Sequence, residues 1–146
     1  MSISEEQLNR YYRYALALTN HDDEAYDLVH EAIVNLRGKF VFKVDAYIIR
    51  SIRNLFINKI KRSGSSWQEL EEHSAVSQAP NPELGLELEQ ILAQLKPEER
   101  ELLFLVEVEG YTYREIAKIT GVKQGTLLSK LHRLKERLAK WRKDND

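Results

Sequence analysis

Apolar residues in the N-terminal half recur at the spacing of an α-helix. After Asp22 and Asp23, they follow at alternating steps of three and one: Ala25, Leu28, Val29, Ala32, Ile33 and Leu36. This spacing gives a helix one continuous apolar side. The two aspartates suit its N-terminal end as capping acids, so we expect a helix that begins there.

A second helix is expected from about Asp45 to Arg62. Its apolar side gathers Ile48, Ile49, Ile52, Leu55, Phe56 and Ile60. Its polar side gathers Arg50, Asn54, Asn58 and Lys61, flanked by Arg53, Lys59 and Arg62. Asparagine is a poor residue in mid-helix because its side chain competes for backbone hydrogen bonds. Between cations, such amides suit base edges beside phosphate contacts, although an ordinary solvated face stays open as the alternative.

The C-terminal half continues the helical pattern with several breaks. The stretch "PELGLELEQILAQL" predicts a helix with Leu84, Leu88, Ile91, Leu92 and Leu95 inward. Pro97 suits the first turn of the next helix, "PEERELLFLVEVEG", which Gly110 ends.

The stretch from Tyr111 to Leu138 breaks one amphipathic helix at Gly121 and begins another. Thr112 and Glu115 form a T-x-x-E capping box, so a short helix is expected from Tyr113, with Ile116, Ala117 and Ile119 buried. The longer helix that follows has an apolar stripe of Leu127, Leu131, Leu134, Leu138 and Trp141. Two helices joined by a short glycine-containing turn predict a helix-turn-helix, with an antiparallel helix pair in a structural bundle as the alternative.

The polar face of this last helix carries groups suited to DNA. Ser129, His132 and Arg133 lie opposite the apolar stripe, Lys130 lies at the edge, and Gln124 and Thr126 lie near the N-terminal end. Hydroxyl, amide and cationic side chains are the types that contact base edges and phosphates in the major groove.

Between the two helical halves, Ser63–Glu83 is polar, rich in serine and proline, and without period. Such a composition is typical of a linker. We therefore predict an all-α protein of two small helical domains joined by a flexible linker. The domains are residues 1–62 and residues 83–146, the linker is residues 63–82, and the C-terminal domain is a helix-turn-helix.

Charge is strongly segregated along the 146 residues, although the net charge is only −1. Lys43–Arg62 carries six basic and one acidic residue, and Arg114–Lys143 carries ten basic and two acidic residues. Between them, Glu69–Glu109 carries eleven acidic and two basic residues. Two cationic blocks separated by an acidic one suggest two contacts with a polyanion, or else ordinary solvated helix faces.

Composition excludes several other classes of site. The chain has no cysteine, so disulfides and thiolate zinc sites are excluded, and its four histidines show no ligand spacing. No metal, cofactor or catalytic residue is expected, because the acidic residues lie apart from the basic blocks and no P-loop, dinucleotide fingerprint or H-E-x-x-H occurs. The longest apolar run, Leu102–Val106, has five residues, and the N-terminus lacks a secretory pattern. We expect a cytoplasmic protein that does not insert into a membrane.

Several stretches together resemble bacterial RNA polymerase sigma factors. "LKPEERELLFLVEVEGYTYREIAKITGVKQGTLLSKLHRLKERL" resembles their region 4. "RYYRYALALTNHDDEAYDLVHEAIVNLRGK" resembles regions 2.1–2.2, and "DAYIIRSIRNLFINKIKR" is similar to regions 2.3–2.4. The order and the intervening linker match the extracytoplasmic-function type, which has regions 2 and 4 only.

The resemblance implies partners and roles for particular residues. Asp27, Leu28 and Glu31 would bind the clamp coiled coil of the RNA polymerase β′ subunit, and region 4 would touch the β flap through residues that we do not assign. The promoter −10 element would be contacted by Tyr47, Arg50, Arg53, Asn54, Asn58, Lys59, Lys61 and Arg62. The −35 element would be contacted by Gln124, Thr126, Ser129, Lys130, His132 and Arg133. The resemblance also allows an anti-sigma factor as a partner.

Three features depart from the family pattern. The segment between "LRGK" and "VDAY", which in this group helps to capture an unstacked −10 base, is shorter than usual. Leu128 replaces a residue that is usually polar or basic on the DNA side. Lys123 stands where serine or proline often starts the recognition helix.

Two functions remain open on the sequence. An alternative sigma factor would join core polymerase and direct promoter recognition. A stand-alone helix-turn-helix regulator, or a sigma-like polymerase co-activator, would explain Tyr111–Leu138 equally well. The stand-alone regulator would leave Asn54 and Asn58 unused and predicts palindromic sites bound without polymerase. An enzyme such as a nuclease is disfavoured by the segregation of acidic from basic residues.

Overall fold

The computed structural model describes residues 2–64, 90–91 and 93–144, which are helical with connecting turns and contain no strand. The chain divides into two units, here called the N-terminal unit (residues 2–64) and the C-terminal unit (residues 90–144). The predicted linker, apart from Ser63 and Gly64, lies outside the described residues, as does most of the helix expected over "PELGLELEQILAQL". No helix in the described ranges combines the length and apolarity needed to cross a bilayer.

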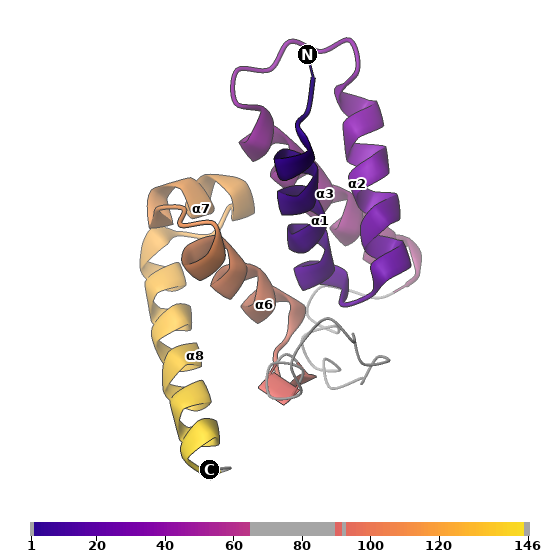
Figure 1. The fold of residues 1–146 in the computed structure, drawn as a ribbon. Coiled ribbons are helices and arrows are strands. Elements are labelled where there is room, and N and C mark those ends of the chain that lie inside the picture. Colours follow the sequence, from indigo (N-terminus) through magenta and orange to yellow (C-terminus); the bar gives the residue numbers. More distant parts are fainter. Residues whose placement is uncertain (1, 65–89, 92, 145–146) are drawn as a thin grey trace. The chain divides into compact units, whose positions relative to one another are not determined.

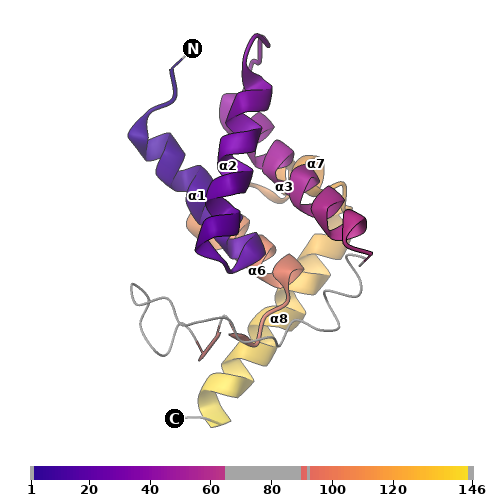
Figure 2. The ribbon, with the colours of Figure 1, turned by 90° about the vertical axis from the view of Figure 1, so that its right-hand side faces the viewer.

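The N-terminal unit is a bundle of three helices, α1 (Glu5–Thr19), α2 (Asp22–Leu36) and α3 (Val44–Arg62), each in contact with the other two (Figure 1). Figure 2 shows the same three helices packed together from the side. The core combines the predicted apolar sides of α2 and α3 with apolar residues of α1. Its most completely buried large side chains are Tyr11, Tyr14, Leu18, Ile48, Ile49 and Ile52.

The start of α2 differs in detail from the expectation. The N-cap is His21, whose Nδ1 accepts a hydrogen bond from the Glu24 backbone N–H at 3.3 Å. Asp22 and Asp23 occupy the first turn instead, where negative charge is favourable beside the free N–H groups of a helix end. The predicted helix is therefore present, but the aspartates act through the dipole rather than as the cap.

The C-terminal unit contains α6 (Pro97–Leu103), η1 (Phe104–Val108), α7 (Tyr113–Thr120) and α8 (Gln124–Asp144). Leu95, Leu102, Leu105, Ile116, Leu127, Leu131 and Leu134 are buried in its core. Leu138 and Trp141, which were predicted for the same stripe of α8 as Leu127, Leu131 and Leu134, are only half-buried. The C-terminal turns of α8 extend beyond α6 (Figure 2).

The single helix predicted from Pro97 to Gly110 changes its winding at Phe104. Residues Phe104–Val108 form a π-helical turn, in which the Glu109 N–H donates to the Phe104 carbonyl at 3.0 Å. The wider turn alters which side chains face inward, so Phe104 and Leu105 are buried while Val108 is 59% exposed. A regular 3.6-residue period cannot predict such a turn.

The predicted helix-turn-helix is present as α7, a turn and α8. Thr112 caps α7: its hydroxyl accepts from the Glu115 N–H, and the Glu115 carboxylate accepts from the Thr112 N–H, both at 3.1 Å. Gly121 ends α7 with a left-handed φ of 78°, and its N–H donates to the Ala117 carbonyl at 2.8 Å. Ile116 and Ile119 are buried as expected, whereas Ala117 is only half-buried.

Candidate nucleic-acid interface

The polar side of α3 lies at the surface of the N-terminal unit. Arg50, Asn54, Asn58 and Lys61, here called the amide stripe, are all exposed. Neither asparagine makes a side-chain hydrogen bond to the part of the chain that the structure describes. The amide donors and acceptors are therefore available to another molecule. An ordinary solvated face would have the same property, so exposure alone does not separate the two interpretations.

The cations that flank the amide stripe differ in their surroundings. Arg62 is exposed, whereas Arg53 is half-buried. The Lys59 ammonium lies 3.8 Å from the Glu24 carboxylate, with both side chains about half exposed. Such an exposed pair contributes little energy, about 0–1 kcal/mol, and a phosphate can displace it.

The loop between α2 and α3 presents two aromatic rings that the sequence did not single out. Phe40 is 88% exposed and Phe42 is 93% exposed, and their rings meet edge to face with centroids 6.5 Å apart. Next to them in the chain, the Lys39 ammonium donates to the Tyr47 hydroxyl at 3.1 Å and lies 5.8 Å from the centre of the Tyr47 ring. Large exposed rings close to cations are the groups that stack on unpaired bases.

A hydrogen-bond network fixes the start of α3 against α1. The Asp45 carboxylate accepts from Gln7 Nε2 at 3.0 Å, from Arg10 Nη1 at 2.8 Å and from the Tyr11 hydroxyl. Burial alone would raise the pKa of Asp45, but the hydrogen bonds from Tyr11 and Gln7 and the charge of Arg10 together outweigh it and lower that pKa. The network ties the start of α3, next to the loop of residues 37–43 (here called the aromatic loop), to α1.

The acidic side of α2 keeps only part of the predicted polymerase-binding set. Asp27 and Glu31 are exposed one turn apart, and no ion pair to a described residue engages either of them. Leu28 is 4% exposed and packs in the core, so its side chain is not available to a partner on this surface. The expectation that Leu28 lies on the polymerase-binding surface is thus corrected: Leu28 belongs to the apolar stripe of α2, which faces the core.

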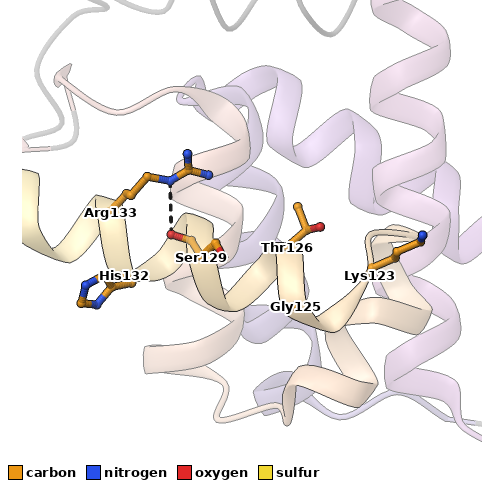
Figure 3. A pocket seen from close by; sticks show the side chains of 6 residues that line it. All are labelled: Lys123, Gly125, Thr126, Ser129, His132 and Arg133. Atoms are coloured by element: carbon orange, nitrogen blue, oxygen red, sulfur yellow. Dashed lines mark hydrogen bonds between the residues drawn. The ribbon is translucent and has the colours of Figure 1, made fainter.

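The outer face of α8 is hollowed into an open concave surface, lined by Lys123, Gly125, Thr126, Ser129, His132 and Arg133 (Figure 3). Four of these six residues belong to the predicted DNA-contacting set. Arg133 is steadied by its own helix, because its Nε donates to the Ser129 carbonyl at 3.3 Å. His132 lies 3.0 Å from the Glu136 carboxylate on the next turn. Lys123 and Gly125 were not in the predicted set. Lys123 lies in the turn just before α8 and Gly125 in the first turn of α8, and these positions beside the predicted residues were the only sequence signal for their role.

Two predicted residues lie outside this concave surface. Gln124 is exposed nearby, whereas Lys130 is half-buried and donates to the Glu98 carboxylate of α6. Glu98 is only 19% exposed, so the ammonium is drawn toward α6 rather than toward the concave surface.

Further ion pairs join α8 to its neighbours. Arg137 lies 2.8 Å from Glu99 of α6, and Lys135 lies 2.7 Å from Glu107 of η1. The hydrogen bond that Lys135 donates to the Glu107 carboxylate also raises the pKa of Lys135. Within the described residues, at least three of the ten cations counted in Arg114–Lys143 thus lie against carboxylates of the same unit, and Lys130, whose partner Glu98 is mostly buried, is the one most withdrawn from a polyanion.

Burial lowers the pKa of Arg100 in α6 to about 10, and its guanidinium donates to the Leu95 carbonyl at 2.8 Å. This buried cation supports the chain at the start of α6. Across residues 2–64, 90–91 and 93–144, histidine and acidic side chains nowhere form a group of three that could hold a metal ion.

Comparison with known proteins finds similarity over the helix-turn-helix and over most of the chain. Residues 85–138 match the family model "Sigma-70, region 4". The chain is 31% identical over 151 aligned positions to the ECF RNA polymerase sigma factor SigE of Mycolicibacterium smegmatis, covering 91% of this chain. It is 26% identical to the ECF RNA polymerase sigma factor EcfG of Rhodopseudomonas palustris, covering 86% of this chain and 75% of that relative.

The chain spans 57% of the length of the SigE relative. A solved structure, the sigma factor RpoE in complex with the anti-sigma factor NepR from Bartonella quintana, shares the fold. Its TM-score is 0.71 at 23% identity, covering 94% of this chain and 92% of that one. These likenesses confirm the predicted all-helical fold with a helix-turn-helix and the resemblance to extracytoplasmic-function sigma factors.

Proposed function

Because residues 85–138 match the family model "Sigma-70, region 4" and the chain is similar over most of its length to ECF sigma factors, we propose that it is an alternative sigma factor. In this role it joins core RNA polymerase, directs the polymerase to a promoter and helps to open the DNA. The chain itself catalyses no reaction, and the polymerase carries out RNA synthesis in the cytoplasm.

The −35 element binds the concave surface of α8. Thr126, Ser129, His132 and Arg133 line it, and Lys123 and Gln124 lie near the N-terminal end of the helix. In helix-turn-helix proteins the N-terminal residues of the second helix contact base edges in the major groove. The hydroxyls and the guanidinium supply the donors and acceptors that such contacts need.

The −10 element binds the amide stripe of α3. Asn54 and Asn58 offer amide groups to bases, while Arg50, Arg53, Lys59, Lys61 and Arg62 contact phosphates. The exposure of both asparagines supports this assignment, because a buried asparagine could not contact DNA.

An unpaired base near the −10 element stacks on the aromatic loop. Phe40 and Phe42 are almost fully exposed, and Tyr47 stands at the adjoining end of α3 beside Lys39. Although the loop is shorter than is usual in this group, it supplies stacking surfaces and a cation, the two components of a site for single-stranded nucleic acid.

Core polymerase binds the acidic side of α2 through Asp27 and Glu31. Both carboxylates are exposed and unengaged by the described residues, so they are available to cations on the β′ clamp. The β flap contacts the C-terminal unit. An anti-sigma factor is a further partner, by analogy with the complex formed by the structural relative RpoE.

Two DNA-binding units on one chain raise the overall affinity for a promoter that carries both elements. Once one unit is bound, the other meets its element at a high effective concentration, without any new contact. This proposal places the predicted linker, residues 63–82, between the units as a spacer.

One observation supports the proposal: the described residues present two exposed polar surfaces that carry cations, the amide stripe of α3 and the concave surface of α8, and only the second belongs to the helix-turn-helix. The direct test is co-elution of the full chain with core polymerase in size-exclusion chromatography. Asp27→Lys with Glu31→Lys should abolish co-elution, because it replaces both carboxylates with cations. Glu5→Lys with Glu6→Lys, the same change of charge on α1, should not.

A stand-alone helix-turn-helix regulator predicts the opposite result. It would elute apart from polymerase, form a dimer and bind a palindromic duplex by itself. Retained co-elution of the Asp27/Glu31 variant would instead reject the docking surface while leaving polymerase binding intact.

A further inference from the structure

Leu128 is an apolar residue on a part of α8 that is otherwise polar. It is 49% exposed, whereas Leu127, Leu131 and Leu134 of the same helix are at most 3% exposed. At 100° per residue, Leu128 adjoins Gly125 one turn earlier and His132 one turn later, and both of these line the concave surface. Leu128 therefore forms one edge of that surface and contributes little to the core.

Gly125 gives independent evidence for close approach at this point. A Cβ at position 125 would meet no atom within 4 Å, and its φ lies outside the left-handed range. Neither packing nor backbone conformation within the chain thus requires glycine there, although alanine is the better helix former. Glycine is suited to a place where a partner's backbone must come near, and a DNA strand against the first turns of α8 would do so.

The groups that each base presents in the major groove determine which base Leu128 can contact. A leucine side chain has no hydrogen-bonding group, so it cannot recognise the donors and acceptors of guanine, adenine or cytosine. Among the four bases, only thymine presents a methyl group, the 5-methyl, at the groove surface. Apolar contact with this methyl group is the one favourable base interaction open to Leu128.

We infer that Leu128 contacts the 5-methyl group of a thymine in the DNA element bound by α8, and so makes the chain prefer thymine at one position. This rests on the proposed function of α8 as a DNA-binding helix. Burial of one methyl group corresponds to about a fourfold change in affinity.

The test removes the methyl group and nothing else. The holoenzyme, formed from the full chain and core polymerase, first selects its preferred duplex from a random library. Each thymine of that duplex is then replaced in turn by deoxyuridine, which keeps every hydrogen-bonding group. Affinity should fall about fourfold at one position for the native chain, and by the same factor for Leu128→Met, which keeps an apolar side chain.

Leu128→Ala should bind the thymine duplex about as weakly as the native chain binds the uracil duplex, and it should be insensitive to the replacement. Val108→Ala, a truncation of an exposed apolar residue on η1, should leave the sensitivity unchanged. Equal sensitivity in native chain and Leu128→Ala would overturn the inference. So would a uniform loss by Leu128→Ala on every duplex, which indicates a protein partner. If the holoenzyme selects no duplex at all, the proposed function itself fails.

Discussion

Lys130 of α8 donates a hydrogen bond to the carboxylate of Glu98 in α6, so a cation beside the concave surface is neutralised within its own unit. Arg137, two turns further along α8, is held in the same way by Glu99. These pairs fix α8 against α6, and they remove from the DNA surface one residue that the sequence had assigned to it.

Glu98→Gln should release Lys130 to bind a phosphate. Total DNA affinity should then rise at low salt, and the dependence of log affinity on log salt should steepen by about one unit, because one more phosphate contact forms. Discrimination between the preferred duplex and random DNA should fall, because the new contact is independent of sequence. Titration of both duplexes at several salt concentrations measures each effect.

The matched control is Asp23→Asn, which makes the same change of net charge in the first turn of α2 without releasing a cation of α8. It should leave the salt dependence unchanged. A lower affinity of Glu98→Gln with an unaltered salt slope would show that the pair acts only in stability.

Asn54→Ala with Asn58→Ala should impair promoter opening more than assembly with polymerase. The exposed amides would be lost from the DNA surface, while the acidic side of α2 is untouched. Permanganate footprinting reports opening, and co-elution reports assembly. Asn9→Ala, which removes an exposed asparagine from α1 of the same unit, should affect neither. Normal opening with poor assembly would reverse the assignment of this face.

Phe40→Ala and Phe42→Ala should each weaken binding of a single-stranded −10 oligonucleotide to the holoenzyme by about 1–3 kcal/mol if the ring stacks on a base. Fluorescence anisotropy with a labelled oligonucleotide measures the loss. Phe40→Tyr and Phe42→Trp should retain most of the affinity because each keeps a stacking surface. Equal losses in the alanine and aromatic variants would argue against stacking.

The Asp45 network should make the stability of the N-terminal unit depend on pH. Because the pKa of Asp45 is lowered on folding, its contribution is present at neutral pH and is lost as pH falls below the ordinary pKa of an aspartate and through the lower folded pKa. Asp45→Asn should destabilise the chain by about 1–3 kcal/mol at pH 7, since hydrogen bonds to a charged group are lost. Urea unfolding at pH 7 and pH 3 should show this difference shrink at the lower pH. A constant difference would exclude the carboxylate charge as its source.

The sequence predicted those features that depend on local spacing. The capping box of Thr112 and Glu115 and the glycine at the end of α7 are fixed by neighbours within a few residues, and both are present. The same holds for the exposure of Asn54 and Asn58, which follows from the apolar stripe opposite them.

Features that depend on distant contacts were not predictable from local spacing. Glu98 and Lys130 are 32 residues apart, so their pairing follows from the packing of α8 on α6 and not from any pattern along one helix. Phe40 and Phe42 are apolar, and hydropathy alone favours their burial, yet the short loop holds both at the surface. The π-helical turn at Phe104 likewise breaks the period on which the helix prediction depended.

Run-off transcription shows whether this chain gives core polymerase a promoter specificity. Purified core polymerase and a library of genomic fragments are incubated with and without the full chain. The account predicts transcripts from a defined set of start sites, each preceded by the same two spaced elements, only when the chain is present. Identical transcript profiles with and without the chain would contradict it.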